Sequence, residues 1–154
     1  MRGIINKPGH NLCWFNAILQ CIMATPKLVN TWVKKPELIR NTAINRKFTS
    51  LIIELWSSPS REPLDIEPFV AEFQKHSPQL EIGEQQDCHE GLVYLLDMLH
   101  EETKHEIFKS NESFLTSMVD GKRREWLTSN RNDYSLISLV FGGVMKSTVI
   151  YTDK

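Results

Sequence analysis

The stretch Gly3-Ile4-Ile5-Asn6-Lys7-Pro8-Gly9-His10-Asn11-Leu12-Cys13-Trp14-Phe15-Asn16-Ala17-Ile18-Leu19-Gln20 places one cysteine between a loop and an apolar helical pattern. Pro8-Gly9 and Asn11 are residues that favour turns and helix caps. From Phe15 onward, apolar side chains recur at helical spacing. The pattern predicts that Cys13 lies at or near the first turn of a helix. Unpaired N–H groups and the helix dipole stabilise a thiolate there, which is one way to activate a cysteine nucleophile.

The composition is that of an ordinary globular domain or part of one, with 154 residues of which 41% are hydrophobic and 24% charged. No apolar run reaches the roughly 18 residues of a membrane span, and no apolar signal core follows Arg2. The net charge of −1 argues against a nucleic-acid partner. The cysteines, at positions 13, 21 and 88, are odd in number and unclustered, which indicates a reducing compartment. We therefore expect an intracellular protein, in the cytoplasm, the nucleus or both.

Hydrophobic periodicity and turn residues predict a mostly helical chain. Helices are expected over 13–24, 26–34, 42–57, 66–76, 87–108 and 112–120. Trp14, Phe15 and Trp56 are expected in the core. Cys21 and Cys88 lie on apolar-patterned helices and are expected to be buried as small apolar side chains. From residue 141 the pattern alternates and is rich in β-formers, which predicts a β segment over 144–151.

The helix expected over 87–108 has two different faces. One face is apolar and is predicted to join the core: Leu92, Leu95, Leu96 and Leu99. The opposite face is acidic and is predicted to be exposed: Asp87, Glu90, Asp97 and Glu101. Residues 81–106 carry eight acidic side chains and one lysine, which suits a basic protein or peptide partner. The alternative is an ordinary solvated helix face.

Two segments resemble sequence boxes of the ubiquitin-specific proteases, a family of papain-like deubiquitinases. Residues 3–20 resemble the cysteine box, G-L-x-N-x-G-N-T-C-Y-x-N-[SA]-x-L-Q, at Gly3, Asn6, Cys13, Asn16, Ala17, Leu19 and Gln20. The loop between Asn6 and Cys13 is two residues longer here. Residues 83–102 resemble the Gln box, G-x-Q-Q-D-A-x-E-F-L-x-x-L-L-D-x-L-H-E-E, with Cys88 in place of Ala and Gly91 in place of Phe.

The resemblance implies an α+β, mostly α fold, the helical thumb half of a papain-like cysteine protease with a β segment at its C-terminal end. Residues 1–154 would be the N-terminal part of the catalytic domain, comprising the thumb and the beginning of the fingers. Cys13 would be the nucleophile.

The same resemblance implies the supporting residues of the site. Asn6 or Asn11, with the backbone N–H of Cys13, would stabilise the oxyanion. Asp87 and Glu90, with Gln86, would hold the Arg-containing C-terminal tail of ubiquitin, since carboxylate–guanidinium pairs can be bidentate.

A thiol protease also needs a histidine base and a residue that orients it. In the family these residues lie far downstream in a separate box. The histidines here, none of which lies in such a context, are His10, His76, His89, His100 and His105. We expect the base to come from elsewhere and this chain alone to be inactive.

No metal and no other cofactor are predicted. Residues 135–149 resemble the segment S-x-I-x-x-L-F-G-G…S-T-V, which leads into the zinc-binding fingers of the family. Tyr151 and Lys154 occupy the aligned cysteine positions, so no zinc is expected. His100 and His105 are five positions apart, whereas a zinc-binding helix needs four.

We therefore predict a thiol-dependent deubiquitinase that hydrolyses isopeptide bonds at the ubiquitin C-terminus, here a half-domain lacking the His box. Its partners would be ubiquitin or ubiquitinated proteins. The first alternative is a catalytically inactive relative that binds ubiquitin or another partner as a scaffold. The missing His box, Gly91 and the absent zinc cysteines favour it, and the retained Cys13 speaks against it. A helical adaptor with no link to ubiquitin is the second alternative, which two matching boxes disfavour.

Overall fold

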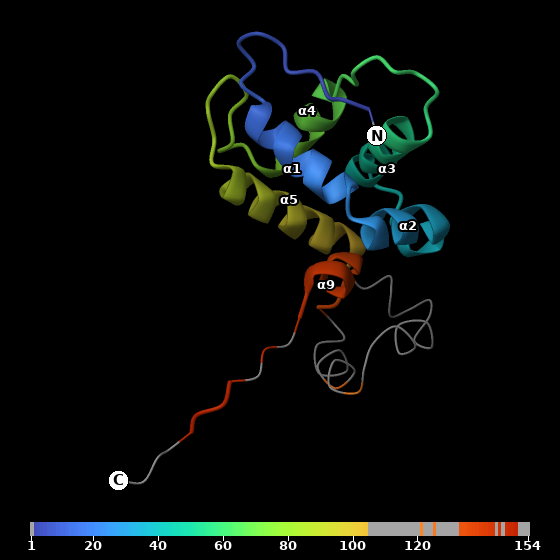
Figure 1. Cartoon of the computed structure of the whole chain (residues 1–154), viewed down its shortest axis with the longest axis vertical. Coiled ribbons are helices and arrows are strands. Elements are labelled where there is room, and N and C mark those ends of the chain that lie inside the picture. Colours follow the sequence, from blue (N-terminus) through green and yellow to red (C-terminus); the bar gives the residue numbers. More distant parts are fainter. Residues whose placement is uncertain are drawn as a thin grey trace.

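The computed structural model describes residues 2–104, 121, 125, 133–143, 145 and 147–150. Nearly all regular structure in this part is helical (Figure 1). The helices are α1 (Cys13–Met23), α2 (Pro26–Lys34), the 3-10 helix η1 (Pro36–Leu38), α3 (Ala43–Trp56), α4 (Glu67–His76), α5 (Cys88–Thr103) and α9 (Leu136–Phe141). An isolated parallel bridge joins Ile4 to Leu64. Among these helices, none combines the length and the apolar character that crossing a bilayer requires.

Short polar side chains and proline set where several helices begin. The side chain of Asp87 caps α5 by accepting a hydrogen bond from the backbone N–H of His89 at 2.7 Å. Ser135 caps α9 in the same way, by accepting from the N–H of Ser138 at 3.1 Å. Pro26 occupies the first turn of α2, where its missing N–H has no helical partner to lose.

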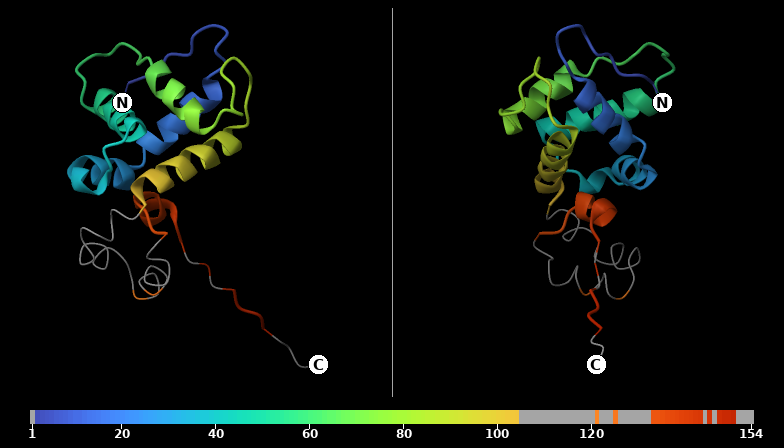
Figure 2. Two further views of the ribbon diagram at one scale, coloured as in Figure 1. Left: turned by 180° about the vertical axis from the view of Figure 1, so that it is seen from behind. Right: turned by 60° about the vertical axis from the view of Figure 1, so that its left-hand side comes forward.

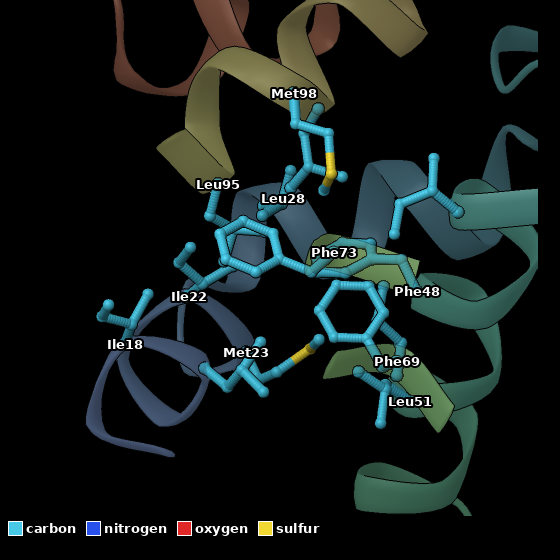
Figure 3. Close-up of a cluster of buried hydrophobic side chains, with 14 of the residues drawn as sticks. Ile18, Ile22, Met23, Leu28, Phe48, Leu51, Phe69, Phe73, Leu95 and Met98 are labelled. Atoms are coloured by element: carbon cyan, nitrogen blue, oxygen red, sulfur yellow. The ribbon is translucent and has the colours of Figure 1, made fainter. Parts of the chain in front are cut away.

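The core lies where α1, α3, α4 and α5 come together (Figure 1). The ring of Phe15 in α1 packs on Phe73 in α4 with centroids 4.8 Å apart. Phe48 in α3 packs on Phe69 at 5.8 Å and on Trp32 at 4.7 Å. Figure 3 shows the Phe48, Phe69 and Phe73 rings among aliphatic side chains from α1, α2 and α5. Each large side chain fully buried here contributes about 1.5–3 kcal/mol, so this cluster holds the helices together.

Helix α5 has the two faces that its sequence predicts. Leu95 and Leu99 are buried against α1 and α9, and Leu92 and Leu96 are partly buried at the edges of the same face. The four acidic residues of the opposite face are all exposed: Asp87, Glu90, Asp97 and Glu101. The apolar and acidic faces are therefore both confirmed.

The mostly helical character and the first five predicted helices are confirmed, with ends shifted by a few residues. Residues 105–108 and the helix predicted over 112–120 lie outside the described residues. The β segment predicted over 144–151 is not found, since its described residues, 145 and 147–150, form no strand. A strand needs a neighbour to accept and donate its backbone hydrogen bonds, and these residues lead away from the helices (Figure 1).

Three predictions of burial are wrong. Trp56 is 51% exposed, because it ends α3 and only its ring edge is held, by a hydrogen bond from Nε1 to the Met23 carbonyl at 3.1 Å. Cys21 is exposed because it lies one helical turn after the exposed Ala17, beside the apolar stripe of α1. Cys88 is exposed at the first position of α5.

Candidate active site

The loop before Cys13 folds back on itself through a turn. The N–H of His10 donates to the carbonyl of Lys7 at 3.1 Å, and Gly9 has a φ of 81°. Proline followed by a glycine with positive φ is typical of a type II turn, so glycine is required at the second of these positions. The extra length of this loop, relative to the family box, is thus accommodated as a turn. The turn brings the two ends of the loop together.

Asn6 and Asn11, the two candidates for oxyanion stabilisation, have different partners. The Oδ1 atom of Asn6 accepts a hydrogen bond from the N–H of Leu12 at 3.1 Å. Its Nδ2 group donates to none of the described residues. The Nδ2 group of Asn11 donates to the carbonyl of Gly83 at 2.6 Å, and Asn11 itself has a φ of 47°. Asn6 therefore keeps both N–H groups of its amide for a partner beside the nucleophile position, whereas Asn11 has one of its two engaged with Gly83.

Two amides of α1 hold the N-terminal segment in place. Asn16 donates through Nδ2 to the carbonyl of Ile5 at 3.1 Å. Gln20 donates through Nε2 to the carbonyl of Arg2 at 3.2 Å. These are the side chains that match the cysteine box after Cys13. Their role in the described structure is to brace the loop.

An ionic cluster attaches the loop to the start of α4. The Lys7 ammonium lies 2.8 Å from Asp65 and 2.8 Å from Glu67, and Nδ1 of His10 lies 3.1 Å from Glu67. The hydrogen bond from Lys7 holds the pKa of the Asp65 carboxyl below its usual range. The His10 ring therefore lies against the start of α4. No described side chain forms a hydrogen bond with the thiol of Cys13.

The starts of α1 and α5 lie at the same end of the molecule, as Figures 1 and 2 both show. The loops that precede them are joined, because the N–H of Gly83 donates to the carbonyl of His10 at 3.0 Å. The Trp14 ring of α1 covers Gly91 of α5. Cys13, exposed at the first position of α1, therefore stands near the first turn of α5.

Helix α5 presents polar side chains at this end. Asp87 is exposed but also serves as the N-cap, so it has a structural role that the sequence does not reveal. Glu90 lies in the first turn, is exposed, and forms no ion pair with a described residue. The Nε2 group of Gln86 makes one long hydrogen bond, at 3.4 Å, to the Glu81 carbonyl. Asp87 and Glu90 thus leave carboxylate oxygens available to a partner.

Trp14 and Gly91 fit each other closely. A Cβ atom built on Gly91 would lie 2.4 Å from Cζ3 and 2.8 Å from Cε3 of Trp14, and 3.0 Å from Cδ1 of Ile18. The family boxes have Tyr and Phe at the positions of Trp14 and Gly91. The aromatic volume missing at 91 is therefore supplied from α1 by the larger indole ring.

This fit predicts that Gly91→Ala destabilises the chain although alanine is the better helix former. The propensity gain is about 1 kcal/mol, whereas overpacking a closed contact costs about 1–3 kcal/mol and forces α1 and α5 apart. Urea unfolding should show a lower midpoint for Gly91→Ala. Trp14→Phe shortens the ring that meets the new Cβ, so the double variant should recover about 1 kcal/mol relative to the sum of the single changes. A Gly91→Ala protein more stable than the parent would contradict this reading.

His100, Glu101 and Asp133 offer ligand atoms that lie within 4.8 Å of one another. The ammonium of Lys104 lies 2.6 Å from Asp133 and 3.0 Å from Glu101. It holds the pKa of Asp133 below its usual range by hydrogen bonding. Nδ1 of His100 lies 2.7 Å from the Ser135 hydroxyl. A lysine thus already balances these carboxylates, and the cluster links α5 to the start of α9.

Comparison with known proteins gives consistent matches. The sequence model described as ubiquitin carboxyl-terminal hydrolase matches residues 2–153. Ubiquitin carboxyl-terminal hydrolase 2 of Bos taurus is 30% identical over 154 residues, covering 93% of this chain and 25% of the relative. The Homo sapiens protein of that name is 29% identical, with 93% and 26% covered. Ubiquitin carboxyl-terminal hydrolase 5 of Arabidopsis thaliana is 29% identical over 170 residues. The match covers 97% of this chain and 17% of that relative. The chain thus spans about a quarter or less of the length of these relatives.

Proposed function

Because the chain belongs to the ubiquitin carboxyl-terminal hydrolase family, we propose that it carries the nucleophile and the tail-guiding helix of a thiol-dependent deubiquitinase. The reaction is hydrolysis of the isopeptide bond after the C-terminal glycine of ubiquitin. Residues 1–154 are the N-terminal part of the catalytic domain, the helical thumb and the beginning of the fingers. Three free, exposed thiols suit a reducing location in the cytoplasm or nucleus.

In this proposal the Cys13 sulfur attacks the carbonyl carbon of the ubiquitin terminus. The carbonyl oxygen becomes an oxyanion, which accepts hydrogen bonds from the Cys13 N–H and from a side-chain amide. For this amide we favour Asn6 over Asn11. The C–N bond then breaks, the lysine amine leaves with a proton, and water hydrolyses the thioester. Residues outside those described supply the base that moves these protons.

The observation that carries the proposal is the placement of Cys13 next to the acidic start of α5. The thiol is exposed at a helix N-terminus, where the positive end of the dipole favours negative charge on sulfur. The exposed carboxylates of Asp87 and Glu90 stand on the neighbouring helix start. A basic peptide tail held by these carboxylates would have its end close to Cys13.

Ubiquitin that carries an electrophile at its C-terminus tests this arrangement, because the probe needs tail binding and a reactive thiol but no turnover. We expect one ubiquitin per chain, attached to Cys13 and not to Cys21 or Cys88, by intact mass and peptide mapping. Asp87→Asn and Glu90→Gln should each slow labelling by about 5–150-fold, the scale of hydrogen bonds to charged groups. The Asn substitution keeps the N-cap. Added salt should slow labelling of the parent chain more than labelling of the variants.

Asp97→Asn is the matched control, since Asp97 is exposed on the same helix but lies farther from its start. It should label at the parental rate. Iodoacetamide should alkylate Cys13 equally in all variants, which separates tail recognition from thiol reactivity. Equal labelling of the three carboxylate variants would mean that α5 attracts ubiquitin only diffusely. Reversible ubiquitin binding without attachment to Cys13 would favour the inactive scaffold instead.

A further inference from the structure

The face between α2 and α3 carries two adjoining hollows that share no residue with the cysteine loop or with the start of α5. One has a volume of about 420 Å³ and extends from α3 to the segment around η1. The other, of about 220 Å³, lies between α2 and the last turns of α3. Val33 and Ile53 line both hollows, so together they form one groove. Cys13 is the first residue of α1, whereas α2 follows the other end of that helix (Figure 1).

The groove is apolar at its centre although it faces solvent. Val33 and Ile53 are each 49% exposed, and Trp56 is 51% exposed. The large apolar side chains exposed on the described helices are Val33, Ile53, Trp56, Val93 and Phe141. Three of these five therefore gather on this one face. Exposed apolar residues are normal when scattered, but a contiguous group flanking hollows is typical of a binding surface.

The rim of the groove is basic. Lys34, Arg40 and Arg46 line it, and no described lining side chain is a carboxylate. Arg40 is committed within the fold, because it donates to the backbone carbonyls of Glu101 and Glu102. The side chains of Lys34 and Arg46 form no such contacts with α5.

The guanidinium of Arg46 donates to the backbone and side-chain oxygens of Asn41, both at 3.1 Å, and forms no ion pair with a described carboxylate. Lys34 is exposed and forms no ion pair with any described residue. Two cations that pair with no described carboxylate therefore border an apolar groove. An occupant with carboxylates beside apolar side chains would satisfy both features at once.

We propose that this groove binds a short acidic segment of another protein that carries two large apolar side chains. The apolar side chains enter the two hollows and cover Val33, Ile53 and Trp56. Carboxylates of the segment pair with Lys34 and Arg46. This mode of recognition combines apolar anchors for affinity with charge complementarity for orientation and choice of partner. A nucleic acid would satisfy the cations but would leave the apolar hollows open.

A phage-displayed library of random 16-residue peptides, selected against the whole chain, tests the proposal. Peptides that bind should be enriched in Asp and Glu beside pairs of large apolar residues. Ile53→Ser should weaken their binding about five- to tenfold, as expected for losing half-buried apolar area. Val93→Ser is the control, because Val93 is 51% exposed on α5, outside the groove. The Val93→Ser variant should bind the selected peptides as tightly as the parent does.

A charge-reversed double variant, Lys34→Glu with Arg46→Glu, tests the electrostatic part. It should bind the acidic peptides at least tenfold more weakly and lose their salt dependence. Selected peptides without acidic enrichment, or equal binding by Ile53→Ser, would overturn the proposal. So would self-association of the chain that Ile53→Ser abolishes and Val93→Ser does not, since the groove would then belong to a second copy. Cross-linking from Val33→Cys to another segment of the same chain would also overturn it.

Discussion

The 154-residue chain, purified alone, is expected to attach to an electrophilic ubiquitin probe but to hydrolyse ubiquitin amides at a negligible rate. Members of a nucleophile–base pair act as a unit, so losing the base costs at least about 10⁴-fold in kcat. In the described structure no side chain forms a hydrogen bond with the Cys13 thiol. In the nearest histidine in sequence, His10, the Nδ1 atom lies 3.1 Å from the Glu67 carboxylate.

The measurement is release of a fluorescent amine from the ubiquitin C-terminus, followed under multiple-turnover conditions. Cys13→Ala sets the background, and the parent chain should not exceed it measurably. Alkylation of Cys13 by iodoacetamide in the same preparation shows that the thiol is intact. Sustained turnover that depends on Cys13 would contradict the prediction. His10→Ala and His89→Ala would then identify which histidine within this chain acts as the base.

Helical spacing was a good guide to the fold wherever a helix had one covered face. Phe48, Leu51, Ile52 and Leu55 follow that spacing in α3, and all four are buried. The same spacing wrongly assigns Trp56 to the core. Periodicity gives the direction in which a side chain points, but not whether another element covers it. Helix α9 escaped prediction for a different reason. Its six residues are too few to show a helical period, and their apolar run reads equally well as a strand.

The candidate site was predictable in its parts and not in its assembly. The turn residues and the apolar pattern place Cys13 at the start of a helix, as found. The sequence gives no sign that Trp14 fills the space above Gly91, because their contact joins two helices that lie far apart in the chain. The choice between Asn6 and Asn11 was also open, since both residues can donate hydrogen bonds. Only the folded loop shows that the Asn11 amide is held by a hydrogen bond to the Gly83 carbonyl.

That difference leads to the last prediction, which applies to a protein containing this chain that turns over ubiquitin substrates. Asn6→Ala should lower kcat and kcat/KM together by about 10²–10³-fold with KM unchanged, as for loss of one oxyanion donor. An oxyanion exists only after attack, so its donor adds little to substrate binding. Asn6→Asp is a sharper variant. It keeps the oxygen that accepts from the Leu12 N–H at 3.1 Å, but it replaces the N–H donor with an oxygen.

Substitution of Asn11 should have a different effect. Asn11→Gly tolerates the φ of 47° but removes the bond to the Gly83 carbonyl at 2.6 Å, so it should lower the unfolding midpoint more than it lowers kcat. Asn6→Asp should do the reverse, with kcat reduced as far as in Asn6→Ala and the midpoint nearly unchanged. Steady-state kinetics and urea unfolding of the same four proteins, parent included, separate the two roles. A parental kcat for Asn6→Asp would show that Asn6 is not the oxyanion donor. So would a roughly 10²-fold loss of kcat in Asn11→Gly at parental stability.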